Sequence, residues 1–496
     1  MNTEIPENNL KQQNPEPTLK EKTAKGLFWG GMGNLLQQII GMVFGIIIAR
    51  ILNPDDYGLV AMLTIFSAIA TTFIDSGFSV ALINKKDADH KDYNAVFWFG
   101  ILIGLGIYLI LFFVSPLIAR FFKQPELTNL SRLVFLGFII NSAGIVHNAI
   151  LLKNMMVKQI GIANILGIFF SGIVGLLLAL NGYAYWGLAI QQISFLLFSV
   201  LLRWYFLPWR PTLRFNFSPL REMMGFSSKL FATNIISQVQ WNLFAVLLGK
   251  FYNPTQLGYY SQGTKWMNMV SAVISGMTNM VAQPVFVQAN DDNERFLRVF
   301  RKMTRFVAFV TFPVFIGLSF IAPEFIQITI GEKWTNSIIF LQLMCGWGGM
   351  APFILLYTQL LISHHKSDII LKGSLIISLS QMFIITVMFF MKASILHIVA
   401  CYVATFCLSY IYWYHYGSRL IGIRWTHIVK DIFPYLITTL FSVFVSMLIL
   451  FHVKNLYIVF TGKILLFVGI YLIVLYIFDS KMLKDSIVLL KHKTIN

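Results

Sequence analysis

Residues 50–58 read Arg-Ile-Leu-Asn-Pro-Asp-Asp-Tyr-Gly, and residues 250–258 read Lys-Phe-Tyr-Asn-Pro-Thr-Gln-Leu-Gly. The two stretches share asparagine, proline and glycine at equivalent places, and each begins with a basic residue. Each one separates two long apolar segments. Asn-Pro favours the start of a turn, proline fixes its own φ, and glycine restarts the chain at low steric cost. The pattern predicts a helix–turn–helix hairpin that occurs twice.

Matches continue around both hairpins at the same offset. They pair Asn34 with Asn234, Gln38 with Gln238, Phe44 with Phe244 and Thr64 with Thr264. An N-P-x-x-x-G match alone is a weak motif that chance can produce, but the neighbouring matches favour an internal duplication. A repeat of this length makes each half of the chain a structural unit.

The composition is that of a membrane protein. The chain has 496 residues, of which 57% are hydrophobic and 12% are charged. The net charge of +17 would also suit a nucleic-acid partner, but the cations lie in short loops between apolar runs, which favours a membrane instead. The three cysteines lie inside apolar segments without metal-ligand spacing, so neither a metal site nor a disulfide framework is expected.

Runs of about 20 apolar residues predict fourteen spanning helices. They fall near residues 26–48, 57–83, 94–118, 130–150, 160–180, 184–202, 226–249, 257–287, 303–322, 335–362, 369–391, 394–417, 432–451 and 457–478. Six helices separate the copies of the hairpin, so the repeats are parallel and not inverted. The predicted fold class is an all-α integral membrane protein with two parallel six-helix lobes and two further C-terminal helices.

The predicted units follow from these spans. They are a polar cytoplasmic tail (1–25), an N-lobe (26–202), a proline-containing cytoplasmic linker (203–225), a C-lobe (226–418), two additional helices (419–480) and a cytoplasmic tail (481–496). With the N-terminus inside, the alternating loops give the cytoplasmic side an about threefold excess of Lys and Arg. Both termini are therefore expected inside, and both Asn-Pro hairpins on the outer face.

No catalytic or metal-binding motif is present: the chain lacks HExxH, CxxC, GxxxxGK[ST] and GxSxG patterns. Polar residues instead recur at helical spacing in the matched segments of both halves. Such a face must turn toward protein or water, because polar groups are costly in hydrocarbon. Two interpretations stay open, namely helix–helix packing and the lining of a hydrated cavity. The cavity interpretation selects Asn34, Gln38, Asp75, Lys229, Asn234, Gln238, Gln262, Lys265, Asn279, Arg305 and Lys372.

Two of these residues are ionisable and lie deep in predicted spans. Asp75 is either a cavity acid or one half of a buried pair, and Lys265 either lines the cavity or extends toward the outer interface. The predicted balance of charge in the cavity is cationic. A cationic, tyrosine-bearing cavity suits an anionic ligand with polar, stackable parts, since cations pair with phosphate and aromatic rings pack on sugar faces.

Residues 23–100 carry Thr-Ala-Lys-Gly-Leu-Phe-Trp, Ala-Arg-Ile-Leu-Asn-Pro-Asp-Asp-Tyr-Gly and Phe-Ile-Asp-Ser-Gly-Phe-Ser-Val-Ala-Leu-Ile. In these motifs the chain resembles the polysaccharide transporter (Wzx-type) branch of the MOP flippase superfamily. The resemblance implies a MATE-like arrangement of two lobes around a central cavity, with alternating access. It also implies a bacterial inner membrane and the outward flipping of a polyprenyl-pyrophosphate-linked oligosaccharide during surface polysaccharide or lipopolysaccharide synthesis.

In that mechanism the head group enters the cavity while the polyprenyl tail stays in lipid. Arg50 and Lys250 are then candidates for an outer gate, or alternatively anchors at the interface. The expected partners are the lipid-linked oligosaccharide, membrane lipids and polysaccharide polymerase machinery, with no nucleic acid. No cofactor is expected; proton or sodium coupling is open, with Asp75 as the deep acidic candidate.

Three other functions compete with this one. A MATE-like multidrug or small-solute antiporter that takes organic cations needs deep acids, and Asp75 is the one candidate. A glycan polymerase or ligase needs a large outer loop, and the longest outer segment, near residues 119–129, is short. A scaffold without transport gives no reason for polar faces at duplicated positions. The predicted function is therefore transport and not catalysis.

Overall fold

The computed structural model describes residues 19–75, 78–85, 87–213, 216, 218–221, 235, 238, 242, 244–289, 292–364, 366–478 and 482–483. All regular secondary structure within these residues is helical. The first half contains α1 (Leu19–Ile51), α2 (Pro54–Met62), α3 (Thr64–Asp75), α4 (Phe78–Asn84), α5 (His90–Phe122), α6 (Leu127–Lys153), α7 (Val157–Leu180) and α8 (Ala184–Phe206).

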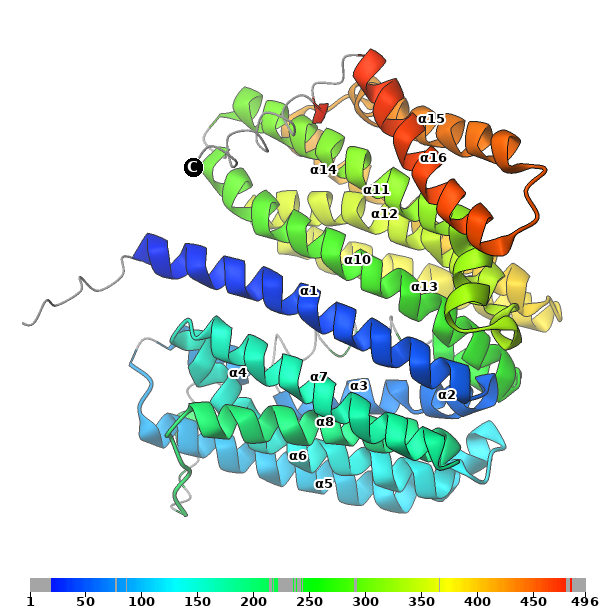
Figure 1. Cartoon of the computed structure of the whole chain (residues 1–496). Helices are drawn as coiled ribbons and strands as arrows, with labels where there is room; N and C mark the ends of the chain where they lie inside the picture. Colours follow the sequence, from blue (N-terminus) through cyan, green and yellow to red (C-terminus); the bar gives the residue numbers. More distant parts are fainter. Residues whose placement is uncertain are drawn as a thin grey trace, which may run out of the picture.

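The second half contains α10 (Pro254–Ala289), α11 (Asn293–Thr329), a short 3-10 helix η1 (Glu332–Trp334), α12 (Ser337–Ser363), α13 (Ser367–Phe390) and α14 (Ile395–Ile421), followed by α15 (Trp425–Leu450) and α16 (Leu456–Ile477). Figure 1 shows two groups of helices, α3–α8 and α10–α16, with α1 running between them. The helices α15 and α16 lie on the far side of the second group. This arrangement fits two helical lobes with two helices added to the second.

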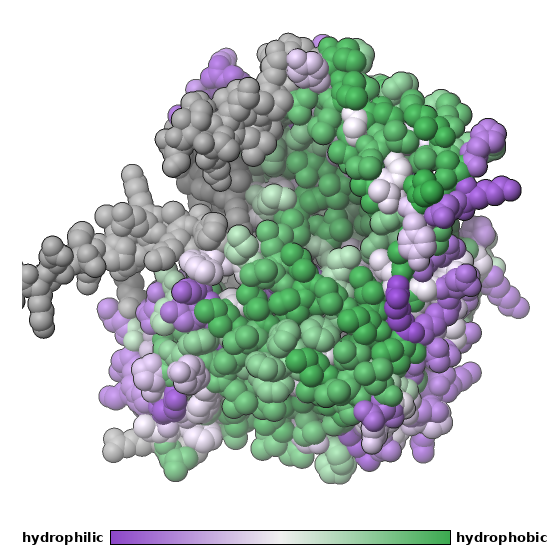
Figure 2. Space-filling view, viewed as in Figure 1, coloured by the Kyte–Doolittle hydropathy of each residue, from purple (hydrophilic) through white to green (hydrophobic). Residues whose placement is uncertain are grey.

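Twelve helical segments of the described chain are long and apolar enough to cross a membrane. Figure 2 shows a broad apolar band on the viewed face, with hydrophilic residues at both of its edges. The chain is therefore a multi-pass membrane protein. The predicted span 257–287 corresponds to α10, which is not among the twelve, and the predicted span 226–249 lies largely outside the described residues. A total of fourteen spans stays a prediction.

The second predicted span, 57–83, starts earlier and is broken. Its first helix begins at Pro54, because proline suits the first position of a helix and Asn53 precedes it in an extended conformation. The Asp56 carboxylate accepts a hydrogen bond from the Asn53 backbone N–H at 2.9 Å. A turn at Leu63 then separates α2 from α3. Hydropathy alone registers the apolar run and misses both the cap and the break.

The ninth predicted span, 303–322, is also longer than expected. The helix α11 begins at Asn293, where the Asp292 carboxylate accepts hydrogen bonds from the backbone N–H groups of Glu294 and Arg295 at 2.9 and 3.2 Å. Such an N-cap satisfies backbone donors that a helix start leaves free. The basic residues that follow form the first turns of the spanning helix.

The apolar core shows where the two halves of the chain are joined. At the end of the bundle that holds both Asn-Pro hairpins, here called the hairpin end, one core cluster combines Ile48 and Met62 with Phe244, Leu257 and Trp334. Away from this end, separate clusters form around Phe78, Leu82, Val146 and Leu151 in the first half and around Phe286, Phe300, Tyr357 and Tyr435 in the second. The halves therefore share a core at the hairpin end and have their own cores elsewhere.

Candidate functional site

A cavity of about 600 Å³ lies between the two halves, directly beneath the hairpin end. The first half contributes Gln38 of α1, Ala61 of α2 and Thr64 of α3. The second half contributes most of the polar and aromatic lining, which comprises Asn242, Tyr260, Ser261, Thr264, Lys265, Asn268, Trp347 and Tyr402. The lining mixes amides, hydroxyls, aromatic rings and one lysine, which is suited to a large polar ligand.

A second cavity of about 440 Å³ continues from the first one along α10. The two share Asn268, Ala272 and Trp347, and the second extends past Ser275 to Asn279. Because these positions recur at intervals of three and four residues, one face of α10 lines both cavities. The polar residues that recur at helical spacing on α10 thus line the two cavities.

Lys265 supplies the positive charge of the cavity. It lies on α10, where its ammonium is 5.4 Å from the centroid of the neighbouring Trp266 ring, and it approaches Gly45 of α1 in the other half. Among the residues that the structure describes, no carboxylate pairs with Lys265. Placing an unpaired charge at this depth is costly, so the site favours water or an anionic ligand.

Aromatic rings form part of the cavity wall and are held by further rings behind them. The Trp347 ring stacks on Phe406 with centroids 4.6 Å apart, and the Tyr402 ring stacks on Phe244 at 4.5 Å. Aromatic faces of this kind pack well against the apolar faces of sugars.

Three of the predicted cavity residues lie where the cavities are. Gln38 and Lys265 line the main cavity, and Asn279 lines its extension, where its side-chain oxygen accepts a hydrogen bond from Gln359 at 2.8 Å. Gln238 lies one helical turn before the lining residue Asn242, whose side-chain amide donates to the Gln238 carbonyl at 3.0 Å.

Four of the predicted residues lie apart from these cavities. Asn34 is exposed on α1, Lys372 is exposed on α13, and Gln262 is fully buried in α10. Arg305 turns toward α15, where its Nε lies 3.7 Å from the Asp431 carboxylate. The sequence could not indicate this acid, since the helix that carries it is more than a hundred residues away. The side chain of Asp75, and residues Lys229 and Asn234, lie outside the described part of the chain.

Several lining residues were not among the predicted ones. Ser261 and Asn268 lie four residues before and three residues after Lys265, so helical spacing from that lysine identifies both. Trp347 and Tyr402 come from α12 and α14, and no sequence signal distinguishes them from ordinary core aromatics.

The sequence also did not predict a partly buried ion pair between α11 and α16. The Lys463 ammonium of α16 contacts both carboxylate oxygens of Glu324 on α11, at 2.8 and 2.9 Å, and donates to the Phe320 carbonyl at 3.1 Å. Pro323 lacks the N–H that would bond the Ser319 carbonyl, and Gln342 of α12 donates to that carbonyl at 3.1 Å instead. The contacts of Lys463 fix the additional helix α16 to α11, and the Gln342 bond joins α12 to α11.

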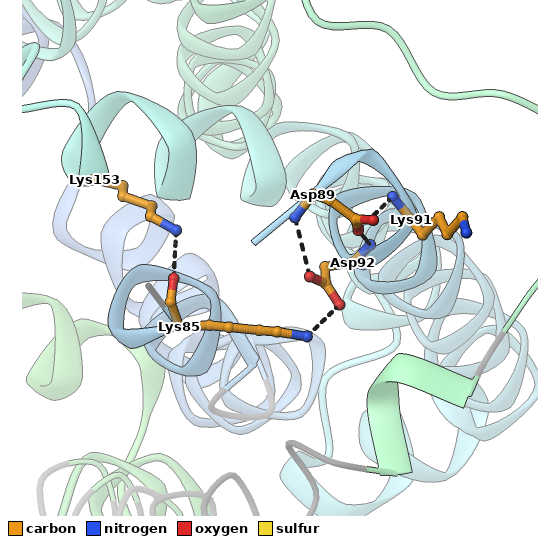
Figure 3. Close-up of polar contacts among 5 residues, drawn as sticks. All are labelled: Lys85, Asp89, Lys91, Asp92 and Lys153. Carbon is orange, nitrogen blue, oxygen red and sulfur yellow. Dashed lines mark hydrogen bonds and ion pairs between the residues drawn. The ribbon is translucent and has the colours of Figure 1, made fainter. Parts of the chain in front are cut away.

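At the opposite end from the hairpins, a polar cluster ties together α4, α5 and α6 (Figure 3). The Lys85 ammonium lies 2.8 Å from the Asp92 carboxylate, and Lys153 donates to the Lys85 carbonyl. The backbone N–H of Asp92 bonds the Asp89 carboxylate and holds the pKa of Asp89 below its usual value. The cluster stabilises one half of the molecule and contributes nothing to the cavity.

The hairpin end is closed by a reciprocal backbone contact. A Cβ atom on Gly58 would lie 1.9 Å from the Pro254 carbonyl oxygen, and one on Gly258 would lie 1.9 Å from that of Pro54. The matched residues Asp55 and Thr255 also bond each other, with the Thr255 hydroxyl donating to the carboxylate. Such reciprocity is what a two-fold axis between equivalent elements produces. The repeated motif therefore meets itself between the two halves.

Three cations of the described chain cross from one half to the other at this end, and one of them, Lys333 of η1, donates to the Arg50 carbonyl at the end of α1 at 2.9 Å. Arg50 of α1 donates from Nε to the Thr329 carbonyl at the end of α11, at 2.6 Å. Lys250 donates to the Phe121 carbonyl at the end of α5, and its ammonium lies 4.1 Å from the centroid of the Phe121 ring. The last carbonyls of a helix lack backbone partners and carry partial negative charge, so cations are favoured there. Each half thus supplies a cation that caps a helix of the other.

The two-lobed, all-helical fold with a polar cavity between the halves is that of a multi-pass membrane carrier. Residues 47–339 match the family described as "Polysaccharide biosynthesis protein", and the chain belongs to this family. The expected resemblance is therefore confirmed.

Several relatives are similar over much of the chain. Lipopolysaccharide biosynthesis protein WzxC of Escherichia coli (strain K12) is 25% identical over 66% of this chain and 67% of its own. Teichuronic acid biosynthesis protein TuaB of Bacillus subtilis (strain 168) is 23% identical over 66% and 68%, respectively. An uncharacterized membrane protein in the cps region of Klebsiella pneumoniae is 23% identical over 94% and 97%.

Solved structures share the fold. The lipid II flippase MurJ in an inward closed conformation has a TM-score of 0.75 at 15% identity, covering 93% of this chain and all of the other. An inward-facing multidrug resistance MATE family transporter has a TM-score of 0.64 at 15% identity, covering 78% and 94%. These similarities confirm the expected MOP-type, MATE-like fold class.

We expect alanine at Gly58 or Gly258 to separate the two halves at the hairpin end, because its Cβ would overlap a carbonyl oxygen that has no room to move. Overlaps in packed interiors cost about 1–3 kcal/mol. The measurement is cross-linking between cysteines placed by Asp55→Cys and Thr255→Cys in an otherwise cysteine-free chain. Each glycine variant should lower the cross-linked fraction severalfold. Gly276→Ala, on the same helix as Gly258 and with open space around it, is the control; equal cross-linking in all variants would contradict the reciprocal contact.

Proposed function

We propose that this protein is a flippase that moves a polyprenyl-pyrophosphate-linked oligosaccharide from the cytoplasmic to the outer leaflet by alternating access, during the synthesis of a surface polysaccharide. The observation that carries the proposal is a polar, aromatic cavity between two lobes that are sealed together at one end, with a lysine that no described carboxylate pairs with. Family membership and relatives named for polysaccharide and lipopolysaccharide biosynthesis support the substrate class.

The cavity supplies the chemistry that such a head group needs. The Lys265 ammonium offsets the loss of water around the pyrophosphate, while amides and hydroxyls such as Asn242, Ser261 and Asn268 bond sugar hydroxyls. Trp347 and Tyr402 offer aromatic faces to the sugar rings. The apolar polyprenyl tail stays in the bilayer, so the protein encloses the part of the substrate that lipid excludes.

The reciprocal hairpin contact forms the outer gate, and Arg50 and Lys250 hold it closed through hydrogen bonds from one lobe to the other. Each cation caps a helix of the other lobe, so opening the gate requires both to leave their carbonyls. The sealed hairpin end, together with the separate cores farther away, supports an inward-facing arrangement in which substrate enters from the cytoplasmic leaflet.

The assignment of inside and outside rests on the Lys and Arg bias of the loops. It implies cytoplasmic termini, while the predicted spans give an N-lobe of residues 26–202 and a C-lobe of residues 226–418, and the polysaccharide relatives support a bacterial inner membrane. Polysaccharide polymerase machinery is the expected consumer of the flipped substrate. Coupling to protons or sodium, with Asp75 as the candidate acid, belongs to the same proposal.

A MATE-like antiporter of cationic compounds is the alternative, since that fold is shared. The charge of the described cavity argues against it. A carrier for organic cations needs carboxylates in its binding site, whereas the described lining of this cavity carries a lysine and no acid.

Removal of the protein tests the function. Cells that lack it should accumulate lipid-linked oligosaccharide in the cytoplasmic leaflet, measured by the accessibility of the sugar to an impermeant oxidant in right-side-out and inside-out vesicles. Surface polysaccharide should fall in parallel. Unchanged surface polysaccharide and lipid pools, together with a loss of drug efflux, would favour the antiporter instead.

Lys265→Met should weaken export at normal expression, because the variant keeps the apolar stem and loses the charge. Charge-assisted hydrogen bonds contribute about 1.5–3 kcal/mol, so the affinity for the head group should fall roughly 10- to 150-fold. The measurement is the rate of head-group translocation in vesicles that contain purified protein. Lys430→Met, at an exposed lysine of α15, is the matched control. Full activity of Lys265→Met would remove this lysine from the binding site.

A further inference from the structure

One glycine of α1 accommodates the cavity lysine of the opposite lobe. A Cβ atom on Gly45 would lie 2.6 Å from Nζ and 3.4 Å from Cε of Lys265. Cβ atoms essentially never approach other atoms within 3.0 Å, so with a side chain at residue 45 the ammonium, the far end of a flexible side chain, would have to move aside; Gly45 itself is buried. The position of the ammonium therefore depends on the absence of a side chain at residue 45.

The other glycines of α1 whose surroundings are described have different neighbours. Gly31 faces open space, Gly33 meets Gly161, and Gly41 meets a methyl group of Ile168. Of these four glycines, Gly45 is the one that meets the second lobe. The space that the Lys265 ammonium occupies beside Gly45 is therefore particular to this residue, and a generally close packing of α1 against its neighbours does not account for it.

We infer that Gly45 is a positioning residue: it forms a seat on α1 that holds the Lys265 ammonium at the seam between the lobes, so that the anion site is complete only while α1 and α10 are apposed. The inference rests on the proposed function, since it concerns how that site binds the pyrophosphate. Rocking of the lobes separates the seat from the lysine that occupies it. A phosphate is thus held tightly in the inward-facing arrangement and weakly once the outer side opens.

In this arrangement the contact between Gly45 and Lys265 gives the two conformations different affinities for the phosphate. A transporter can move a ligand directionally only if its states bind that ligand unequally or are driven by another source. The flexible lysine stem alone would follow the ligand in either state, because four methylenes allow many rotamers. The seat removes that freedom in one state only.

The test measures binding of polyprenyl pyrophosphate to the purified full-length protein, with the corresponding polyprenol as the probe that lacks phosphate. Gly45→Ala should weaken pyrophosphate binding about three- to tenfold, as expected when a side chain is forced from its preferred rotamer, and should leave polyprenol binding unchanged. Gly41→Ala, one turn earlier on the same helix, adds the same methyl group away from Lys265 and is the control.

A double-mutant cycle separates positioning from a general disturbance of α1. In the Lys265→Met background, Gly45→Ala should cause no further loss, because its effect passes through the lysine. An additional loss in that background, or equal weakening of polyprenol binding, would overturn the inference. Wild-type binding of Gly45→Ala would overturn it as well.

The Lys265→Arg variant and the binding of both probes by the wild-type protein supply two further results. If Gly45→Ala does not accumulate, Lys265→Arg examines the same seat from the other side: it keeps the charge, but its planar guanidinium is too large for the space beside Gly45, so binding should still weaken. Wild-type affinity of Lys265→Arg would contradict the seat. A wild-type protein that discriminates neither probe refutes the proposed function itself, which is a different outcome from a normal wild type with an indifferent Gly45→Ala.

Discussion

The structure depends on one backbone contact that is made twice, Gly58 against Pro254 and Gly258 against Pro54. Backbone can approach backbone this closely only where there is no side chain, so the glycine of each Asn-Pro motif is required by the proline of the other. The same motif starts a helix in each half and then meets its copy across the interface. The shared apolar core and the crossed cations Arg50 and Lys250 join the two halves at the same end.

The contact that seals the hairpin end determines from which side an anionic ligand can reach the charge of Lys265. Beneath it lies a lysine without a described acidic partner, in a space lined by amides, hydroxyls and aromatic rings. An isolated charge at such depth is unfavourable, and a phosphate that replaces the lost hydration makes it favourable. Sealing at one end, and a cation behind the seal that no described carboxylate neutralises, together describe a site that an anionic head group reaches from the other side. In the role that we propose for it, Gly45 links the two features by positioning the cation while the lobes are closed at the hairpins.

The sequence alone predicts the relation between the two halves and part of the cavity lining. The duplicated motif fixed the relation between the halves, and the helical spacing of polar residues placed Gln38, Lys265 and Asn279 on hollow space. What was missed depends on partners that are distant in sequence: Arg305 turns to Asp431, and Lys463 to Glu324. Hydropathy also missed the break between α2 and α3, because a turn at Leu63 changes the backbone without changing the apolar character of the chain.

Alternating access through a seal of this kind is tested most directly by paired distance measurements in vesicles. Spin labels on Asp55→Cys and Thr255→Cys report on the hairpin end, and labels on Lys91→Cys and Arg295→Cys, at exposed positions near the starts of α5 and α11, report on the opposite end. With lipid-linked oligosaccharide present, we predict a population in which the first distance lengthens while the second shortens. Distances that change in the same direction, or a hairpin end that stays closed while the substrate is translocated, would contradict the account.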